Sequence, residues 1–167
     1  TLIPSILISL FSLFLLSFAL DKYLDKKITT AVNNSYEIAK SYTDEIRNKT
    51  QSEIILIAYD LNKSINFLNT NINQFKSFLN TQKLIRDMDE VHIIEADGSL
   101  YLTTLEDVSL YRPPLPEALE MVLDDKRPLE IINAYKNQSA SLIKLDNLDG
   151  KYLYIAKYLD KKISQYL

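Results

Sequence analysis

The sequence predicts an α+β protein: an N-terminal transmembrane helix, a long helix, and a domain with an antiparallel sheet of about five strands. Three observations predict this fold. The first 20 residues carry no charge. Residues 21–68 contain neither glycine nor proline, so nothing in them forces a helix to break. From Val91 onward, short apolar runs alternate with turn residues, which is typical of strands.

The composition excludes several classes of function. The chain has 167 residues with a net charge of -3, so it has no strong positive field to hold nucleic acid. It has no cysteine, which excludes disulfides and thiolate metal sites. The hydrophobic fraction of 47% and the charged fraction of 25% are those of an ordinary globular chain.

Residues 1–20, "TLIPSILISLFSLFLLSFAL", are expected to form the transmembrane helix. An apolar run of about 18 to 20 residues is long enough to cross the hydrocarbon core. Pro4 lies near its start, where a lost amide hydrogen has little effect. A cleaved signal peptide is an alternative, because Ser17-Phe18-Ala19 has the spacing of a cleavage site, and a buried core helix is another. No basic region or initiating Met precedes the run, which favours a membrane helix.

Residues 21–68 have a stripe of side chains at alternating spacings of four and three, as on one face of a helix. The stripe consists of Leu24, Ile28, Ala31, Ser35, Ile38 and Tyr42. Two interpretations remain open. One is a continuous stalk with this stripe as the seam of a homodimer. The other is two helices, broken near residues 48–52, that pack on their own domain.

Residues 69–160 are expected to form the folded domain. A helix is predicted over 71–88, a β-hairpin over 91–104 with its turn at Asp97-Gly98, and a helix from Pro116. Three strands follow at 128–135, 139–146 and 151–160, with a turn at Asp149-Gly150. Asp160 is expected to cap a last helix over 161–167. We expect that helix to lead to a second transmembrane segment beyond these residues.

Four stretches together resemble a known family. They are "FKSFLNTQ", "VHIIEADGSLY", "YRPPLPEALE" and "KYLYIAKYLDKKI". Their order and spacing resemble the extracytoplasmic sensor region of NtrY-like histidine kinases, membrane sensors of two-component systems associated with nitrogen regulation. The resemblance runs from the membrane segment to Leu167.

The resemblance implies a Cache or PAS-like sensor domain in the periplasm, held between two helices of the bacterial inner membrane. It also implies a homodimer, and a cytoplasmic part with HAMP, dimerisation and ATP-binding modules that contacts the response regulator. The parent protein would then be an ATP-dependent protein histidine kinase. One feature departs from this topology: Lys22, Lys26 and Lys27 follow the membrane run, and basic residues usually flank the cytoplasmic side.

No catalytic arrangement is visible in these residues, so we expect this region to be non-catalytic, with no cofactor and no metal. His92 is the only histidine and is predicted to be a partly buried core or edge residue of a strand. The two glycines are far apart and form no phosphate-binding loop. One histidine and scattered carboxylates give no metal-ligand spacing.

A small-molecule pocket is the remaining candidate site, between a sheet face and the helix from Pro116. The residues that could supply charge and hydrogen bonds there are Arg112, Tyr111, Tyr101, Tyr135 and Lys144. Their alternative roles are surface ion pairs and ordinary sheet packing. Strand alternation separates Ser141, Ile143 and Leu145 from Leu142 and Lys144, and leaves open which face lines the pocket.

The sequence therefore predicts a signal-input domain. Binding of a small molecule or a protein partner would shift it between two states and move the helix beginning near Asp160. Membrane lipid is a further expected partner. The alternative is a membrane-anchored or exported binding or scaffold protein without kinase output. A second apolar run followed by a helical histidine motif in the parent sequence would distinguish the two.

Overall fold

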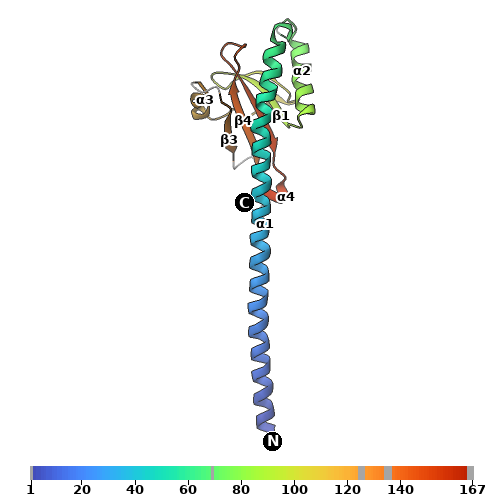
Figure 1. Cartoon of the computed structure of the whole chain (residues 1–167), viewed down its shortest axis with the longest axis vertical. Coiled ribbons are helices and arrows are strands. Elements are labelled where there is room, and N and C mark those ends of the chain that lie inside the picture. Colours follow the sequence, from blue (N-terminus) through green and yellow to red (C-terminus); the bar gives the residue numbers. More distant parts are fainter. Residues whose placement is uncertain (1, 69, 124–126, 134–136, 165–167) are drawn as a thin grey trace.

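The longest element is α1, Leu2–Leu68, a single helix of 67 residues (Figure 1). The computed structural model describes residues 2–68, 70–123, 127–133 and 137–164. At 1.5 Å per residue, α1 is about 100 Å long. It has no break near residues 48–52, where the hydroxyls of Thr50 and Ser52 donate to the carbonyls of Ile46 and Asn48 within the same helix. The interpretation as two helices is therefore wrong.

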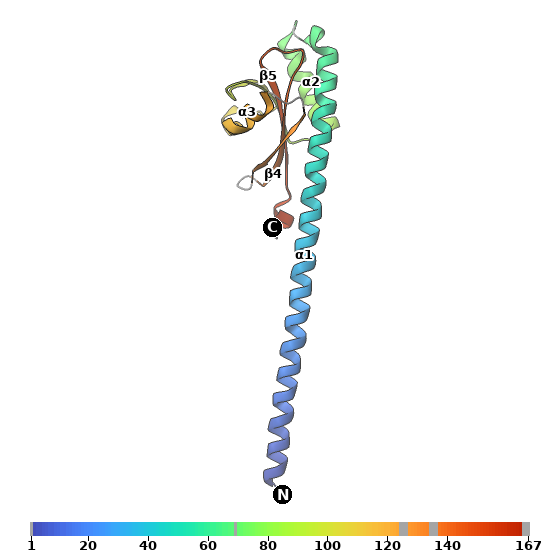
Figure 2. The ribbon, with the colours of Figure 1, turned by 60° about the vertical axis from the view of Figure 1, so that its left-hand side comes forward.

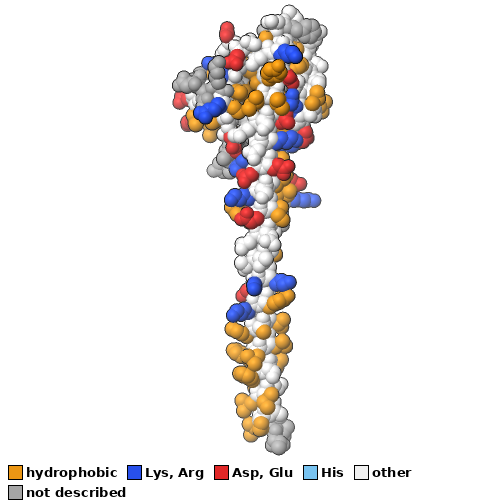
Figure 3. All heavy atoms as spheres, in the orientation of Figure 1, with side chains coloured by type: hydrophobic (Ala, Val, Ile, Leu, Met, Phe, Trp, Pro, Cys, Tyr) orange, Lys and Arg blue, Asp and Glu red, His pale blue; other side chains and the backbone are white. Residues whose placement is uncertain are grey.

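The N-terminal part of α1 stands clear of the rest of the molecule (Figures 1 and 2). The large apolar side chains between Ile3 and Leu20 are 49% to 75% exposed. Figure 3 shows apolar side chains along both edges of the lower helix in this view, with Lys or Arg side chains directly above them. Among the described residues, α1 alone is long and apolar enough to cross a membrane. The first residue of α1 that is buried against the domain is Ala39.

The five predicted strands are β1 (Glu90–Glu95), β2 (Leu100–Thr103), β3 (Leu129–Asn133), β4 (Gln138–Lys144) and β5 (Lys151–Tyr158). They form one antiparallel sheet in the order β2-β1-β5-β4-β3. The α+β prediction is confirmed. The hairpin predicted over 91–104 is β1 with β2, and the central strand of the sheet is β5.

Helices cover the two faces of the sheet separately (Figure 2). On one face lie α1 and α2 (Ile72–Ile85), and on the other lies α3 (Pro116–Leu123). Strand alternation sorts the core residues in the same way. On the α1 face, Ile57 and Leu61 pack with Ile93 and Leu153. On the α3 face, the core consists of Ile94, Leu119, Val122, Ala140, Leu142, Tyr152, Tyr154 and Ala156.

Ion pairs tie α2 and the turn after it to the rest of the domain. Arg86 pairs with Glu53 and Asp60 of α1 at 3.0 and 2.9 Å. Asp87 accepts from Lys49 of α1 at 2.8 Å and from Lys157 of β5 at 2.9 Å. These two hydrogen bonds lower the pKa of Asp87 to about 2, so its carboxylate stays charged down to acidic pH.

The chain returns to α1 after β5. The short 3-10 helix η1 (Val108–Leu110) precedes α3, and α4 (Lys161–Ser164) follows β5. The Asp160 amide donates to the Tyr42 hydroxyl of α1 at 3.1 Å, and the Asp160 carboxylate accepts from the Lys162 amide at 2.8 Å. Asp160 thus caps α4 as the sequence predicts, and it sets α4 beside the middle of α1 (Figure 1).

Candidate functional site

A buried polar cluster lies on the sheet face that is turned away from α1. Residues two apart in a strand share a face, so Glu90 and His92 of β1 point to the same side. Antiparallel pairing places Tyr154 and Ala156 of β5 opposite them. Tyr158, two residues further along β5, reaches the same cluster.

His92 is 0% exposed, and both of its ring nitrogens have partners. Its Nδ1 lies 2.8 Å from Thr103 Oγ1 and its Nε2 lies 2.9 Å from Glu90 Oε2. Thr103 Oγ1 also accepts from the Leu105 amide at 3.0 Å. Every donor then meets an acceptor if the imidazole carries its hydrogen on Nε2 and the Thr103 hydroxyl donates to Nδ1. The side chain is therefore fixed in one orientation.

Glu90 is a carboxylate only 7% exposed. It accepts from His92 on one oxygen and from the Tyr158 hydroxyl on the other. No Lys or Arg among the described residues forms an ion pair with it, so these two donors replace the water that the carboxylate lost on burial. The backbone beside it is held as well, because the Tyr158 amide donates to Asp89 Oδ2 at 2.7 Å.

Two tyrosines pack against the imidazole. The ring of Tyr111 meets it edge-on with centroids 5.1 Å apart, and the ring of Tyr154 stacks on it at 5.7 Å. The Tyr111 hydroxyl donates to the Gly98 carbonyl at 2.7 Å. Burial raises the pKa of Tyr154 to about 12 and raises that of Tyr111 above its ordinary value, so both phenols are neutral at physiological pH. The hydrogen bonds and ring contacts of this cluster link β1, β2, β5 and the segment after η1.

Comparison with known protein families shows which family the chain belongs to. The family described as the NtrY N-terminal region matches residues 1–167. The chain belongs to this family. The resemblance to NtrY-like kinases that the sequence motifs suggested is thereby confirmed.

Two relatives of the chain are considerably longer than the chain itself. The chain is 26% identical over 166 residues to a candidate NtrY-like sensor histidine kinase of Rickettsia felis, covering 99% of the chain and 28% of that protein. It is 22% identical over 170 residues to the nitrogen regulation protein NtrY of Azorhizobium caulinodans, covering 100% of the chain and 22% of that protein. The chain therefore spans about a quarter of the length of these relatives.

The fold of this NtrY-family chain also has a counterpart among solved structures. It superposes with a TM-score of 0.50 on the crystal structure of the sensory domain of the Campylobacter jejuni chemoreceptor Tlp3 (CcmL). The match covers 82% of the chain and 64% of that structure, at 12% sequence identity. At this identity the likeness concerns the fold alone.

Of the predicted ligand-binding residues, Tyr111 lies at the buried cluster of the NtrY-family chain. Arg112 is exposed and donates to the carbonyls of Ser109 and Tyr111 at 3.2 and 3.1 Å. Tyr101 is 39% exposed, with its ring 4.4 Å from the Lys151 ammonium. Lys144 is exposed at the end of β4, and Tyr135 lies outside the described residues. The structure does not bring these residues together into one site.

The cluster residues that sequence reasoning missed are Glu90, Thr103, Tyr154 and Tyr158. His92 was expected in a strand as a partly buried residue, but it is fully buried. One local signal could have shown that Glu90 and His92 belong together. They are two residues apart at the start of a strand, so both polar side chains lie on one face of the sheet. Tyr158 has no such signal, because its contact depends on the pairing of β1 with β5.

The Tyr158 hydroxyl gives the first testable prediction. Tyr158→Phe removes one of two donors to a buried carboxylate. It should lower the free energy of unfolding by about 1 to 3 kcal/mol, the range for a lost hydrogen bond to a charged group. The measurement is denaturant unfolding of the whole chain in detergent micelles. Tyr101→Phe is the matched control and should change the free energy by less than about 0.5 kcal/mol. Equal effects of the two variants would show that the hydrogen bond to Glu90 contributes nothing specific.

Proposed function

We propose that this chain is the membrane-anchored signal-input domain of a two-component sensor histidine kinase, with its folded part in the periplasm and a role in nitrogen regulation. The observation that carries the proposal is the continuity of α1. One helix joins an exposed apolar segment, long enough to cross a membrane, to the core of a sheet domain. A movement of the domain can therefore be transmitted to the apolar segment through one continuous helix, with no flexible linker between them.

The geometry of α1 supports this arrangement. From Leu20, at the end of the apolar run, to Ala39, the first residue buried on the domain, a helix rises about 28 Å. The intervening residues are exposed except for the half-buried Ser35, and they include Lys22, Lys26 and Lys27 close to the apolar run. Lysines at such a place interact with lipid head groups, so we propose that membrane lipid is a partner here.

A conformational change could also pass from the polar cluster to α1 through the end of β5. Tyr158 is held by Glu90 and Asp89 at the end of the central strand, and Asp160, two residues later, is bound to Tyr42 of α1. A ligand or partner that binds one state of the cluster better than the other shifts the population toward that state. We expect such a shift to move α4 against α1 by about 1 to 2 Å, as packed helices do.

A ligand site on the α3 face is part of the proposal, because Tyr111 bridges that face and the cluster. Lys144, exposed on the same side of β4 as Leu142, would then lie at its rim. The kinase activity, with ATP and a response regulator, would belong to the parent protein outside these residues. The name of the Rickettsia relative, a sensor histidine kinase, supports the kinase activity, and the name of the Azorhizobium relative supports the role in nitrogen regulation.

Alanine insertions that rotate one part of α1 relative to the other, made in the parent kinase, test whether α1 transmits the signal. Inserting two alanines between Asn33 and Asn34 turns the apolar segment by about 200° relative to the domain, whereas seven alanines turn it by only about 20°. We expect the two-residue insertion to change kinase autophosphorylation in membrane vesicles by about fivefold or more, the lower range of allosteric coupling. The seven-residue insertion should stay near the original activity. If both insertions leave activity unchanged, α1 does not transmit the signal.

We further propose that the parent protein is a homodimer with part of the predicted stripe as its seam. Leu24, Ile28, Ala31 and Ile38 are exposed, so they are accessible to a second copy. Ser35 is half-buried, and the half-buried Tyr42 already binds Asp160 of its own domain. We therefore expect the seam to lie in the lower part of the stripe.

Disulfide formation tests the seam, since the chain has no cysteine of its own. In a parallel symmetric dimer, each seam residue approaches its own copy, and a disulfide needs Cα atoms within about 7 Å. Ile28→Cys and Ala31→Cys should give covalent dimers on mild oxidation in membranes. Asn33→Cys, on the opposite side of the helix, is the control and should not. Cross-linking of equal extent at all three positions would indicate random collision.

A further inference from the structure

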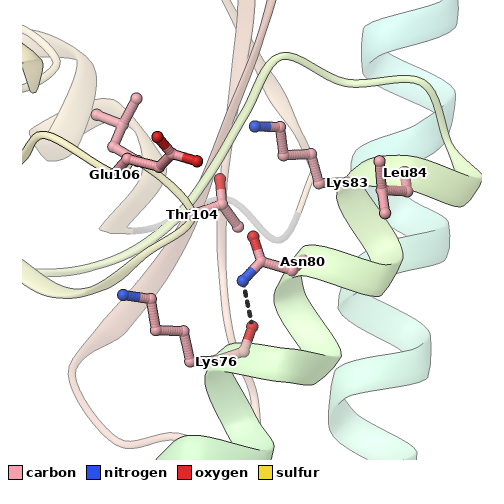
Figure 4. A pocket seen from close by; sticks show the side chains of 7 residues that line it. Lys76, Asn80, Lys83, Leu84, Thr104 and Glu106 are labelled. Atoms are coloured by element: carbon pink, nitrogen blue, oxygen red, sulfur yellow. Dashed lines mark hydrogen bonds between the residues drawn. The ribbon is translucent and has the colours of Figure 1, made fainter.

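A groove lies between α2 and the segment that follows β2 (Figure 4). Its volume is about 480 Å³, within the range of small-molecule sites. One wall is a single face of α2, and the other is the chain from Thr104 to Glu106. The lining residues are Lys76, Asn80, Lys83, Leu84, Thr104, Leu105 and Glu106. This groove is on the side of the sheet that α1 and α2 cover, away from the His92 cluster.

Among the described residues, neither lysine of the groove lies within ion-pair distance of a carboxylate, although Lys83 interacts with Asp89 at longer range. Nearby cations behave differently, since Lys49, Arg86, Lys151 and Lys157 each hold at least one carboxylate. Figure 4 shows both lysine side chains leaving α2 toward the opposite wall, with Asn80 between them. The Asn80 amide nitrogen donates to the Lys76 carbonyl at 3.1 Å, which leaves its oxygen on the groove side.

The spacing of the lysines indicates the kind of ligand. Lys76 and Lys83 are seven residues apart on one helix face, so their Cα atoms lie about 10.5 Å apart along the axis. Two ammonium groups held apart in this way match two separate anionic groups better than one compact anion. Glu106 on the facing wall reduces the positive charge of the groove and repels an anion from that side.

We propose that this groove binds a small organic dianion whose two charges are carboxylates on separate carbons. Lys76 and Lys83 each bind one carboxylate, and Asn80 contributes a polar group between them. This groove is a second site, separate from the ligand site proposed on the α3 face, and its signalling consequence rests on the proposed sensor role. The binding itself can be tested without kinase output.

The groove is connected to the His92 cluster through two adjacent threonines. Thr104, which lines the groove, is tied twice to β1: its amide donates to the Val91 carbonyl at 3.1 Å, and its Oγ1 accepts from the Val91 amide at 3.0 Å. Thr103, the residue before it, contacts His92 Nδ1 on the opposite face. A ligand that displaces Thr104 therefore acts on the strand that carries Glu90 and His92, and through Glu90 on Tyr158.

Isothermal titration of the whole chain in nanodiscs tests the site, with succinate and glutarate as probes at low ionic strength. Acetate, with one carboxylate, and inorganic phosphate, with its charges on one group, are the comparison ligands. We expect a dicarboxylate to bind at least about tenfold more tightly than either, because it gains a second charge-assisted hydrogen bond. Absence of binding by both dicarboxylates, or equal binding of phosphate, would overturn the proposal.

Three groove variants and one matched control sharpen the test. Lys76→Gln and Lys83→Gln should each weaken dicarboxylate binding about tenfold. Lys63→Gln removes an exposed lysine of α1 outside the groove and should leave binding unchanged. Glu106→Gln should strengthen binding, since it removes a like charge from the facing wall. Weaker binding in Glu106→Gln would mean that the ligand presents a cation there, which contradicts a simple dianion.

The outcomes separate the groove from the sensor role. If a dicarboxylate binds through the lysines but leaves autophosphorylation of the parent protein unchanged, the signalling consequence fails and the binding site stands. If neither dicarboxylate binds while the two alanine insertions still differ in kinase activity, the groove proposal fails and the sensor role stands.

Discussion

The packing of the upper half of α1 against the sheet is the interaction on which the rest of the structure depends. Ile54, Ile57 and Leu61 are 0% exposed and pack in one cluster with residues of β1 and β5. Each such side chain contributes about 1.5 to 3 kcal/mol when it is buried. Without α1, the part of this sheet face that α2 leaves uncovered would expose its apolar side chains. The helix that carries the apolar N-terminal segment is therefore also a structural part of the domain, and neither can move far without affecting the other.

The contact between α1 and the sheet changes character along the helix. Toward the end of α1 it is apolar, as described above. Nearer the middle, Arg47 pairs with Glu130 of β3 at 3.0 Å and Gln51 donates to the same carboxylate at 3.3 Å. Partly exposed polar contacts contribute little free energy each and can be rearranged at small cost. We therefore expect α1 to be held firmly at its far end and to adjust near Tyr42, where α4 meets it.

Sequence reasoning was most successful where a local signal determines the structure. The turns at Asp97-Gly98 and Asp149-Gly150 separate strands in the sequence as they do in the structure. The sequence did not decide between a continuous stalk and two packed helices over residues 21–68. A dimer seam and a core face have the same helical period. The sequence could not predict the complete polar cluster for a different reason: Tyr154 and Tyr158 join Glu90 and His92 through the pairing of β1 with β5, which are distant in sequence. Arg112 looked functional beside the prolines, yet its guanidinium binds local carbonyls.

The continuity of α1 is the central claim, and a distance across its middle tests it most directly. Spin labels at Asn33→Cys and Lys63→Cys, both exposed, bracket residues 48–52. Pulsed electron resonance on labelled chains diluted with unlabelled ones in nanodiscs measures the distance within one molecule. A single straight helix predicts a narrow distribution near about 45 Å. A broad distribution, or one centred well below that distance, would show that the helix bends or breaks between the membrane segment and the domain.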